Sequence, residues 1–148
     1  MMIVKNTEEE LEISRDPGLM TPIALAFIGD SVFDLFLRTR IVIGTDVSPK
    51  KMHLQASRFA RAEAQAQMVE GIWDTLTEHE QEIVRRGRNA KVHTIPKHAE
   101  VMQYKIATGF EALLGTLYLE QQDERLWEVM EAGYRYIVEK EEDHGNGR

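Results

Sequence analysis

Two acidic residues lie inside apolar segments of the sequence, far apart along the chain. Asp30 lies within residues 25–33 and Glu111 within residues 108–115, and both segments favour helix. An isolated carboxylate in apolar surroundings costs several kcal/mol or gives up its charge, so buried acids usually have a partner. A shared divalent cation is the usual partner of two such acids, because hard cations prefer carboxylate oxygens. The pair therefore predicts a metal-dependent enzyme.

Simpler roles for these acids are also compatible with the sequence. Asp30 could accept hydrogen bonds from the end of a neighbouring helix, and Glu111 could pair with Lys105 or with a distant arginine. Asp34 and Arg38 are separated by one helical turn, and this spacing favours a surface ion pair over a metal ligand. The spacing of the residues leaves these alternatives open.

Helix signals dominate the chain, and strand patterns are nearly absent. Proline after a capping Thr or Ser predicts helix starts at Pro22 and Pro49, and Thr77 with Glu80 forms a capping box. The predicted helices span residues 22–43, 49–71, 77–87, 97–120 and 123–140, with a loop over residues 87–96. Glycines 29, 109 and 115 are expected to permit close helix packing. The predicted fold is a single all-α helical bundle.

Composition limits the class of protein. The 148 residues suit one domain, and the absence of cysteine excludes disulfides and thiolate metal sites. No apolar stretch could span a bilayer and the start of the chain lacks a signal-peptide pattern, so a cytoplasmic protein is expected. We expect an acidic N-terminal segment over residues 1–16, a domain over residues 17–140 and a frayed tail over residues 141–148.

The net charge of −7 does not exclude a nucleic-acid partner, because the acidity lies at the ends of the chain. Residues 1–16 hold five acids and two bases, and residues 120–148 hold nine acids and four bases, whereas the remainder holds eleven acids and twelve bases.

Residues 83–99 contain no acid. This interval suits contact with a phosphate backbone, and without an aromatic platform it suits a duplex better than a single strand. The candidate RNA-binding residues are Arg85, Arg86, Arg88, Asn89, Lys91, Thr94 and Lys97. Lys50, Lys51, Arg58 and Arg61 on the second helix would widen this surface or serve only solubility.

Three motifs resemble the ribonuclease III family. Residues 25–33, Leu-Ala-Phe-Ile-Gly-Asp-Ser-Val-Phe, resemble its signature helix, and residues 110–119, Phe-Glu-Ala-Leu-Leu-Gly-Thr-Leu-Tyr-Leu, resemble its second catalytic helix. Residues 85–91 and 94–97 resemble the compact Mini-III branch, which consists of the catalytic domain alone. The chain departs from the family pattern at Ile23 and Ala26, where the signature has glutamates, and at Thr108, where the family has an aspartate.

The resemblance implies a ribonuclease III catalytic-domain bundle and a magnesium-dependent endoribonuclease that cleaves double-stranded RNA. It implies a homodimer that leaves 5′-phosphate and 3′-hydroxyl ends and matures the ends of the 23S ribosomal RNA precursor. Asp30 and Glu111 would bind Mg²⁺, with Mn²⁺ as a candidate substitute, and Asp30 would also orient the attacking water. Asp34, Tyr104 and Thr108 are candidates for supporting this metal site.

Two other functions compete with this hypothesis. The missing acids would suit a catalytically silent module that binds structured RNA with the same fold. A helical interaction protein that binds no nucleic acid is the third alternative, but it would leave the basic residues between 85 and 97 unexplained.

Overall fold

The structure, a computed structural model, describes residues 16–44, 48–91 and 100–146. Within these ranges the chain is helical and contains no strand, which confirms the predicted all-α fold. Two short 3₁₀ turns, η1 (Pro17–Leu19) and η2 (Trp73–Thr75), accompany the α-helices. The α-helices are α2 (Pro22–Gly44), α3 (Pro49–Ala60), α4 (Ala62–Ile72), α5 (Glu78–Asn89), α6 (Val101–Leu119) and α7 (Asp123–Asn146).

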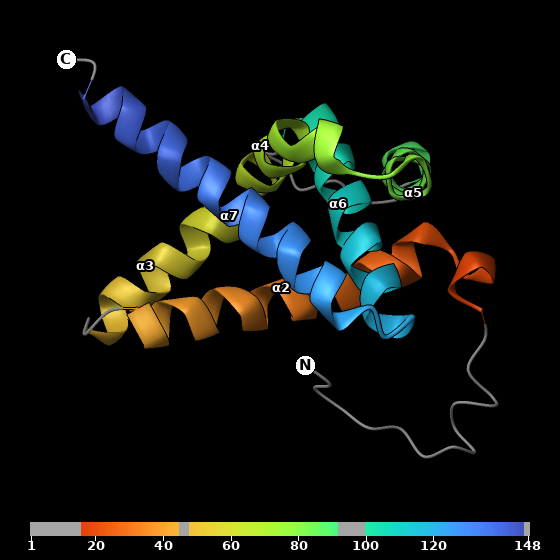
Figure 1. Ribbon diagram of the computed structural model, residues 1–148, viewed down its shortest axis with the longest axis horizontal. Helices are drawn as coiled ribbons and strands as arrows, with labels where there is room; N and C mark the ends of the chain where they lie inside the picture. Colours follow the sequence, from red (N-terminus) through yellow and green to blue (C-terminus); the bar gives the residue numbers. More distant parts are fainter. Residues whose placement is uncertain (1–15, 45–47, 92–99, 147–148) are drawn as a thin grey trace.

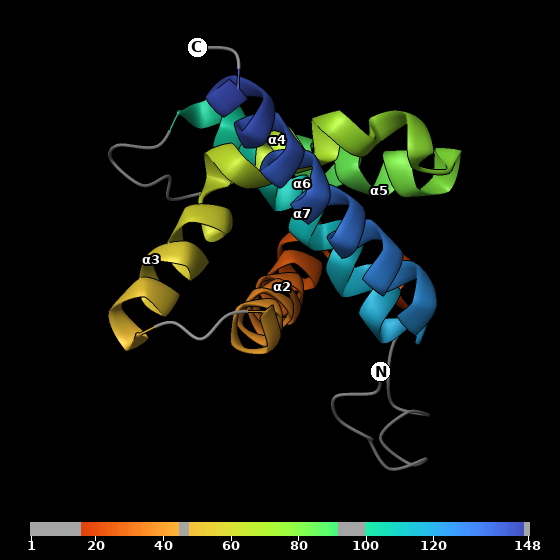
Figure 2. The same cartoon turned by 60° about the vertical axis from the view of Figure 1, so that its left-hand side comes forward.

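Helix α6 lies at the centre of the bundle. It packs against α2, α4, α5 and α7, and both ribbon views show these helices around it (Figure 1, Figure 2). The side chains of Phe110, Leu113 and Leu114 are completely buried, and the ring of Phe110 meets that of Phe33 on α2 edge to face, with 5.7 Å between centroids. A helix that is apolar on all sides is normally buried in a core. Glu111 is the single charged residue in the buried part of α6 and therefore needs an explanation.

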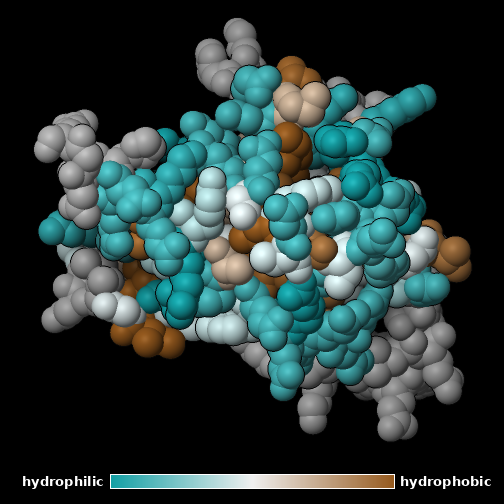
Figure 3. Space-filling model, turned by 45° about the horizontal axis from the view of Figure 1, so that its top comes forward, coloured by the Kyte–Doolittle hydropathy of each residue, from teal (hydrophilic) through white to brown (hydrophobic). Residues whose placement is uncertain are grey.

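The outer faces of the helices are mostly polar, with a few exposed apolar side chains such as Phe27. Figure 3 shows a largely hydrophilic surface over one face of the bundle, with small apolar areas between the polar side chains. No helix in the described ranges is long and apolar enough to cross a membrane. The apolar side chains are instead gathered in the interhelical core.

Helix starts follow the predicted capping residues. The Thr77 hydroxyl accepts a hydrogen bond from the backbone N–H of Glu80 at 3.1 Å, and the Glu80 carboxylate accepts one from the backbone N–H of Thr77 at 2.9 Å. The Ser48 side chain likewise caps the helix that begins at Pro49. These contacts confirm the predicted starts, because each cap satisfies backbone donors that have no partner within the helix.

The prediction of one continuous helix over residues 49–71 is wrong. Arg61 is extended, with φ −64° and ψ 147°, and it separates α3 from α4. The buried Gln65 side chain donates from Nε2 to the Ala60 carbonyl at 3.3 Å, across this break. The break changes the direction of the chain and lets α4 bury its apolar side chains, whereas α3 buries only Ala56 and Phe59.

Two predicted helix ends are also corrected. Helix α5 continues through Gly87 to Asn89, because Gly87 packs against the backbone of Gly109 instead of ending the helix. Helix α7 continues beyond Lys140 to Asn146, so part of the expected frayed tail is helical. Residues 147–148 and the predicted first turn of the fourth helix at residues 97–99 lie outside the described ranges.

An ion pair between the partly exposed Arg125 and the buried Glu80 joins α7 to α5. The Arg125 guanidinium donates to both oxygens of the Glu80 carboxylate, at 2.9 and 2.7 Å, and to the Thr75 carbonyl at 3.0 Å. The hydrogen bonds from Arg125 lower the pKa of Glu80 below its usual value, although burial acts in the opposite direction. The Glu80 carboxylate therefore caps α5 and also anchors α7.

Candidate active site

Helices α2 and α6 cross with their backbones in contact. A Cβ atom on Gly29 would overlap the backbone carbonyl of Glu111, and a Cβ atom on Gly115 would overlap that of Leu25. Both positions therefore need glycine for this approach, as the sequence predicted for close helix packing. Asp30 directly follows Gly29, and the crossing brings its carboxyl group close enough to that of Glu111 to raise the pKa of Glu111.

The two carboxyl groups have different environments. Asp30 is exposed, which corrects the expectation that both acids are buried, because it lies at the solvent edge of the crossing. Glu111 is largely buried, and burial, followed by the hydrogen bond and the charge of Asp30, raises its pKa to about 9. Without a cation, Glu111 is therefore protonated at neutral pH. Within the described residues, Glu111 forms no ion pair with Lys105 or with an arginine.

The donor set of this pair fits a divalent cation. In the described part of the chain, no group of three or more His, Asp or Glu side chains could hold a metal ion. Mg²⁺ nevertheless needs only one or two protein carboxylates when waters and phosphate oxygens complete its octahedron. A cation between the two acids would also remove the repulsion that keeps Glu111 protonated. Asp30 and Glu111 are the residues that would hold it.

The candidate supporting residues have separate local roles. The Asp34 carboxylate accepts a hydrogen bond from Arg38 Nε at 2.9 Å, which confirms the surface ion pair favoured by their spacing. Thr108 is buried one turn before Glu111, and its hydroxyl donates to the Tyr104 carbonyl at 2.9 Å. Ala26 is buried in the core. Ile23 is exposed but apolar. Hence none of the three positions at which this chain lacks a family acid presents a free side-chain ligand.

A groove of about 440 Å³ lies beside Glu111. It is formed where the α3–α4 junction faces the first turns of α6, and its lining includes Arg61, Glu63, Gln65, Glu100, Gln103 and Tyr104. Gln65, Glu63, Glu100 and Gln103 were not predicted from the sequence. The sequence did not predict these residues because it predicted one continuous helix over residues 49–71. Without the break at Arg61, this segment would not turn towards α6.

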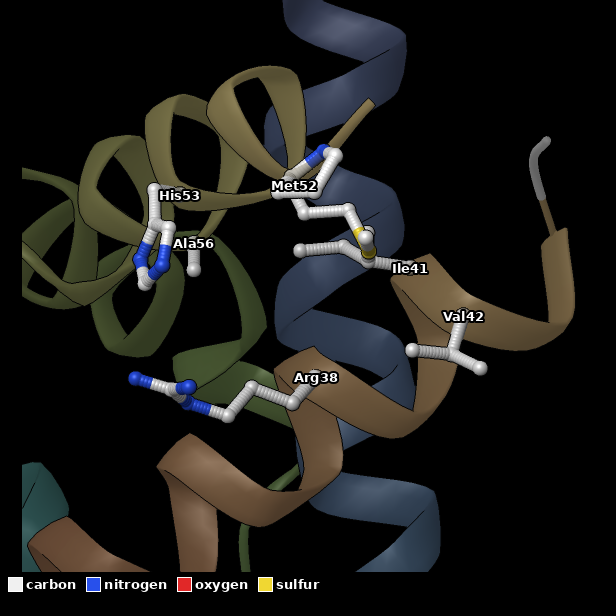
Figure 4. Close-up of a pocket in the computed structure, with 7 residues that line it drawn as sticks. Arg38, Ile41, Val42, Met52, His53 and Ala56 are labelled. Atoms are coloured by element: carbon white, nitrogen blue, oxygen red, sulfur yellow. The ribbon is translucent and has the colours of Figure 1, made fainter. Parts of the chain in front are cut away.

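A second groove, of about 320 Å³, lies between the C-terminal half of α2 and α3. In Figure 4 the side chains of Ile41, Val42 and Met52 lie towards one side, and the nitrogen atoms of Arg38 and His53 lie towards the other. Because no carboxylate lines it, this groove offers no ligand for a hard cation.

In the described part of the basic interval, the helix continues to Asn89, whereas a loop was predicted from residue 87. Arg85, Arg86, Arg88 and Asn89 lie on α5, and Lys91 is exposed just beyond its end. The Arg85 guanidinium lies over the Trp73 ring, 5.3 Å from its centroid, and is 3.6 Å from Glu82. Arg88 Nε donates to the Asn89 side chain at 3.3 Å, and Arg86 lines a small cavity beside the start of α2. Thr94 and Lys97 lie outside the described residues.

The arginine-bearing end of α5 packs against a different face of α6 from the one that carries Glu111. Its contact with α6 is made where Gly87 meets Gly109, two positions before Glu111. The paired carboxylates and the arginine-bearing end of α5 thus lie at similar heights along α6 but on different sides of it.

Comparison with known proteins shows the family of this fold. The family model described as the Ribonuclease III domain matches residues 23–122, which include nearly all of α2 and the whole of α6. The chain belongs to the ribonuclease III domain family. As a member of that family, it is an endoribonuclease of the ribonuclease III type.

Individual relatives match this ribonuclease III domain over most of their length. Mini-ribonuclease 3 of Thermoanaerobacter sp. strain X514 is 44% identical over 133 residues, covering 88% of this chain and 94% of the relative. Mini-ribonuclease 3 of Symbiobacterium thermophilum is 43% identical over 122 residues, covering 82% and 94%. The crystal structure of a Fusobacterium nucleatum protein superposes with a TM-score of 0.73 at 28% identity, covering 87% of this chain and 99% of that protein.

Proposed function

We propose that this endoribonuclease hydrolyses double-stranded RNA with the help of Mg²⁺ and leaves 5′-phosphate and 3′-hydroxyl ends. The observation that carries the proposal is the close approach of the Asp30 and Glu111 carboxyl groups at the α2–α6 crossing, which raises the pKa of Glu111. Two acids in contact are costly in a folded protein unless they share a proton or a cation. A divalent cation in this position would supply the charge stabilisation that phosphodiester hydrolysis needs.

The two acids have complementary roles in this mechanism. Asp30 and Glu111 would hold Mg²⁺, with Mn²⁺ as a substitute, which would supply Lewis-acid stabilisation of phosphate charge and help to activate the attacking water. Glu111 contributes a carboxylate from the buried side, where its position is fixed by the glycine contacts of α6. Asp30 contributes a carboxylate from the exposed side and accepts a hydrogen bond from the attacking water, which orients that water towards the phosphorus.

The charge on α5 supports a duplex substrate. Arg86 is exposed, as is Lys91 just beyond the helix, and the contact between Gly87 and Gly109 holds this end of α5 at the level of Glu111. Cations spaced along a rigid helix suit the phosphates of A-form RNA, which proteins recognise through backbone and 2′-hydroxyl contacts.

The exposed face of α2 supports a homodimer. Phe27 is 82% exposed and lies one turn before Asp30, and Ile23 is exposed one turn further back. Exposed apolar side chains that neighbour each other on one helix face favour an interface, and a two-fold pair is the commonest oligomer. Two such sites near a common axis would allow each protomer to cut one strand of the duplex.

The resemblance to the Mini-III branch also supports a particular substrate and place of action. We propose that the enzyme matures the 5′ and 3′ ends of the 23S ribosomal RNA precursor in the cytoplasm. Sequencing of 23S ribosomal RNA ends in cells carrying the wild-type protein or Asp30→Asn tests this step. Extended precursor ends are expected with Asp30→Asn, and mature ends in those cells would contradict the assignment.

Cleavage of long double-stranded RNA, with and without Mg²⁺, tests the activity. Wild type should cleave only with the metal, whereas Asp30→Asn and Glu111→Gln should lose cleavage while their circular dichroism spectra stay unchanged. Glu70→Gln, an exposed glutamate on α4 outside the site, is the matched control and should cleave normally. Intact RNA with wild type, together with a retained gel shift, would indicate the catalytically silent RNA-binding module instead.

A further inference from the structure

The acidic N-terminal segment joins the described structure beside α5. Residues 8–12 include four glutamates, and the described residues begin shortly after them, at Asp16. The Asp16 side chain caps η1 by accepting a hydrogen bond from the backbone N–H of Gly18 at 2.9 Å. Pro17 and Gly18 line one small cavity together with Arg86 of α5. The point at which the acidic segment is attached is therefore fixed next to the basic residues of α5.

The arginine beside this attachment point has no acidic partner among the described residues. Arg86 is exposed and forms no ion pair there. Glu82, one turn before it on α5, lies 3.6 Å from Arg85 instead. Glu120 lines the same cavity as Arg86, but its carboxylate accepts a hydrogen bond from the Gln122 side chain. An uncompensated guanidinium on the surface attracts carboxylates as well as phosphates.

The connection to η1 is short enough to keep the glutamates near these cations. Glu12 is at most about 18 Å from Pro17 along a fully extended chain. Arg86 lines the cavity beside Pro17, and Lys91 is exposed just beyond the end of α5. A single exposed ion pair contributes only about 0–1 kcal/mol. A short tether, however, holds several carboxylates near several cations at an effective concentration on the order of millimolar, so that such weak pairs form together.

We propose that the glutamates of residues 8–12 bind the basic end of α5 and compete there with the phosphates of RNA. The inference rests on the proposed function, because it takes this end of α5 as part of the RNA-binding surface. A long duplex carries many more phosphates than the segment has carboxylates, so it displaces the segment. The segment thus forms an autoinhibitory contact that lowers the affinity for RNA most strongly at low salt, where ion pairs are least screened.

Binding of a fluorescent RNA duplex in the presence of EDTA measures this competition without cleavage. Replacement of Glu8, Glu9, Glu10 and Glu12 by glutamine should raise the affinity about fivefold at low salt, as expected if the segment covers the surface about four-fifths of the time. The difference should shrink as salt is added, because the screening length falls from about 30 Å at 0.01 M to about 8 Å at 0.15 M.

A matched control separates the contact from the change in net charge. It replaces four exposed acids by amides, three of them in the C-terminal half of α7, which lies well away from α5 (Figure 1). These acids are Glu70, Glu139, Glu142 and Asp143. Because the control changes the net charge of the protein by the same amount, its affinity should rise less than twofold if the local contact is the cause. Thermal melting verifies that both variants are folded.

Two measurements locate the contact on α5. In the background of Arg86→Gln, the same four glutamine substitutions should raise the affinity only about twofold, because coupled residues have non-additive effects. Carbodiimide cross-linking joins carboxylates to lysine amines that touch them, and it should link residues 8–12 to Lys91 within one chain. An excess of RNA duplex should abolish this link, and Lys140, near the end of α7, should form none.

The outcomes separate this inference from the proposed function. If wild type binds the duplex and the four-glutamine variant binds it no more tightly, the competition is absent and the inference is wrong. An equal rise in the control variant, or cross-links to Lys91 that join only separate chains, would also overturn it. If wild type binds no RNA duplex at any salt concentration, the proposed function itself has failed.

Discussion

Replacing Glu111 with glutamine should stabilise the metal-free protein at neutral pH while removing its activity. The pKa of Glu111 is raised to about 9 by burial and by contact with Asp30, against an ordinary value of 4.5. Between these two values, the folded protein retains a proton that the unfolded chain releases. Wild type therefore loses stability as the pH rises through this window, and the loss is complete above the folded pKa. Glutamine has the same shape as the protonated acid but does not titrate.

The magnitude follows from the width of that window. Each unit of pKa shift corresponds to about 1.4 kcal/mol, so at pH 7 the cost of Glu111 in the free energy of unfolding has an upper limit of about 3 kcal/mol. Movement of the exposed Asp30 carboxylate away from Glu111 relieves part of the repulsion. A gain of about 1–3 kcal/mol at pH 7 is therefore expected for Glu111→Gln, with no gain below the ordinary glutamate pKa.

Urea denaturation at pH 4, 6 and 8 in the presence of EDTA measures this gain. Glu70→Gln, which removes an exposed glutamate from α4, is the control and should show no gain that grows with pH. Addition of Mg²⁺ should stabilise wild type but not Glu111→Gln, because only the carboxylate pair holds the ion. The reasoning would be refuted if Glu111→Gln were no more stable than wild type at pH 8, or if its gain were the same at pH 4.

Two further predictions concern the contacts that position the site and join the helices. Gly29→Ala should reduce the free energy of unfolding by about 1–3 kcal/mol and abolish cleavage, because its methyl group would push α2 away from the Glu111 carbonyl. Gly44→Ala, which meets no atom within 4 Å, should leave both stability and cleavage nearly unchanged; equal effects would contradict the crossing. Glu80→Gln should cost about 1–3 kcal/mol at pH 7, because Arg125 loses its carboxylate partner. Since the pKa of Glu80 is lowered, this difference is present above the ordinary pKa of 4.5 and disappears as the pH falls through the folded value. Chemical denaturation over that range measures it, and a difference independent of pH would contradict the ion pair.

Local signals predicted most of the helices. Thr77 and Ser48 cap helices where the sequence placed them, because capping depends on residues within one turn of each other. The errors lie where distant contacts override local preference. The sequence predicts a helix end at Gly87, but Gly87 lies inside α5 and contacts Gly109. The break at Arg61 is stabilised by the Gln65 side chain and by the burial of α4.

The sequence by itself determined the all-α fold, the family and the identity of the two acids, because these depend on short motifs within single helices. Tertiary structure alone decided their environments. Asp30 is exposed and Glu111 largely buried, since the contact of Gly29 with the Glu111 carbonyl sets how deep each carboxyl group lies. The groove beside them also needed the bend at Arg61, which no local signal marks. A pair of carboxyl groups with one strongly raised pKa is a property of two crossing helices, and neither helix carries it alone.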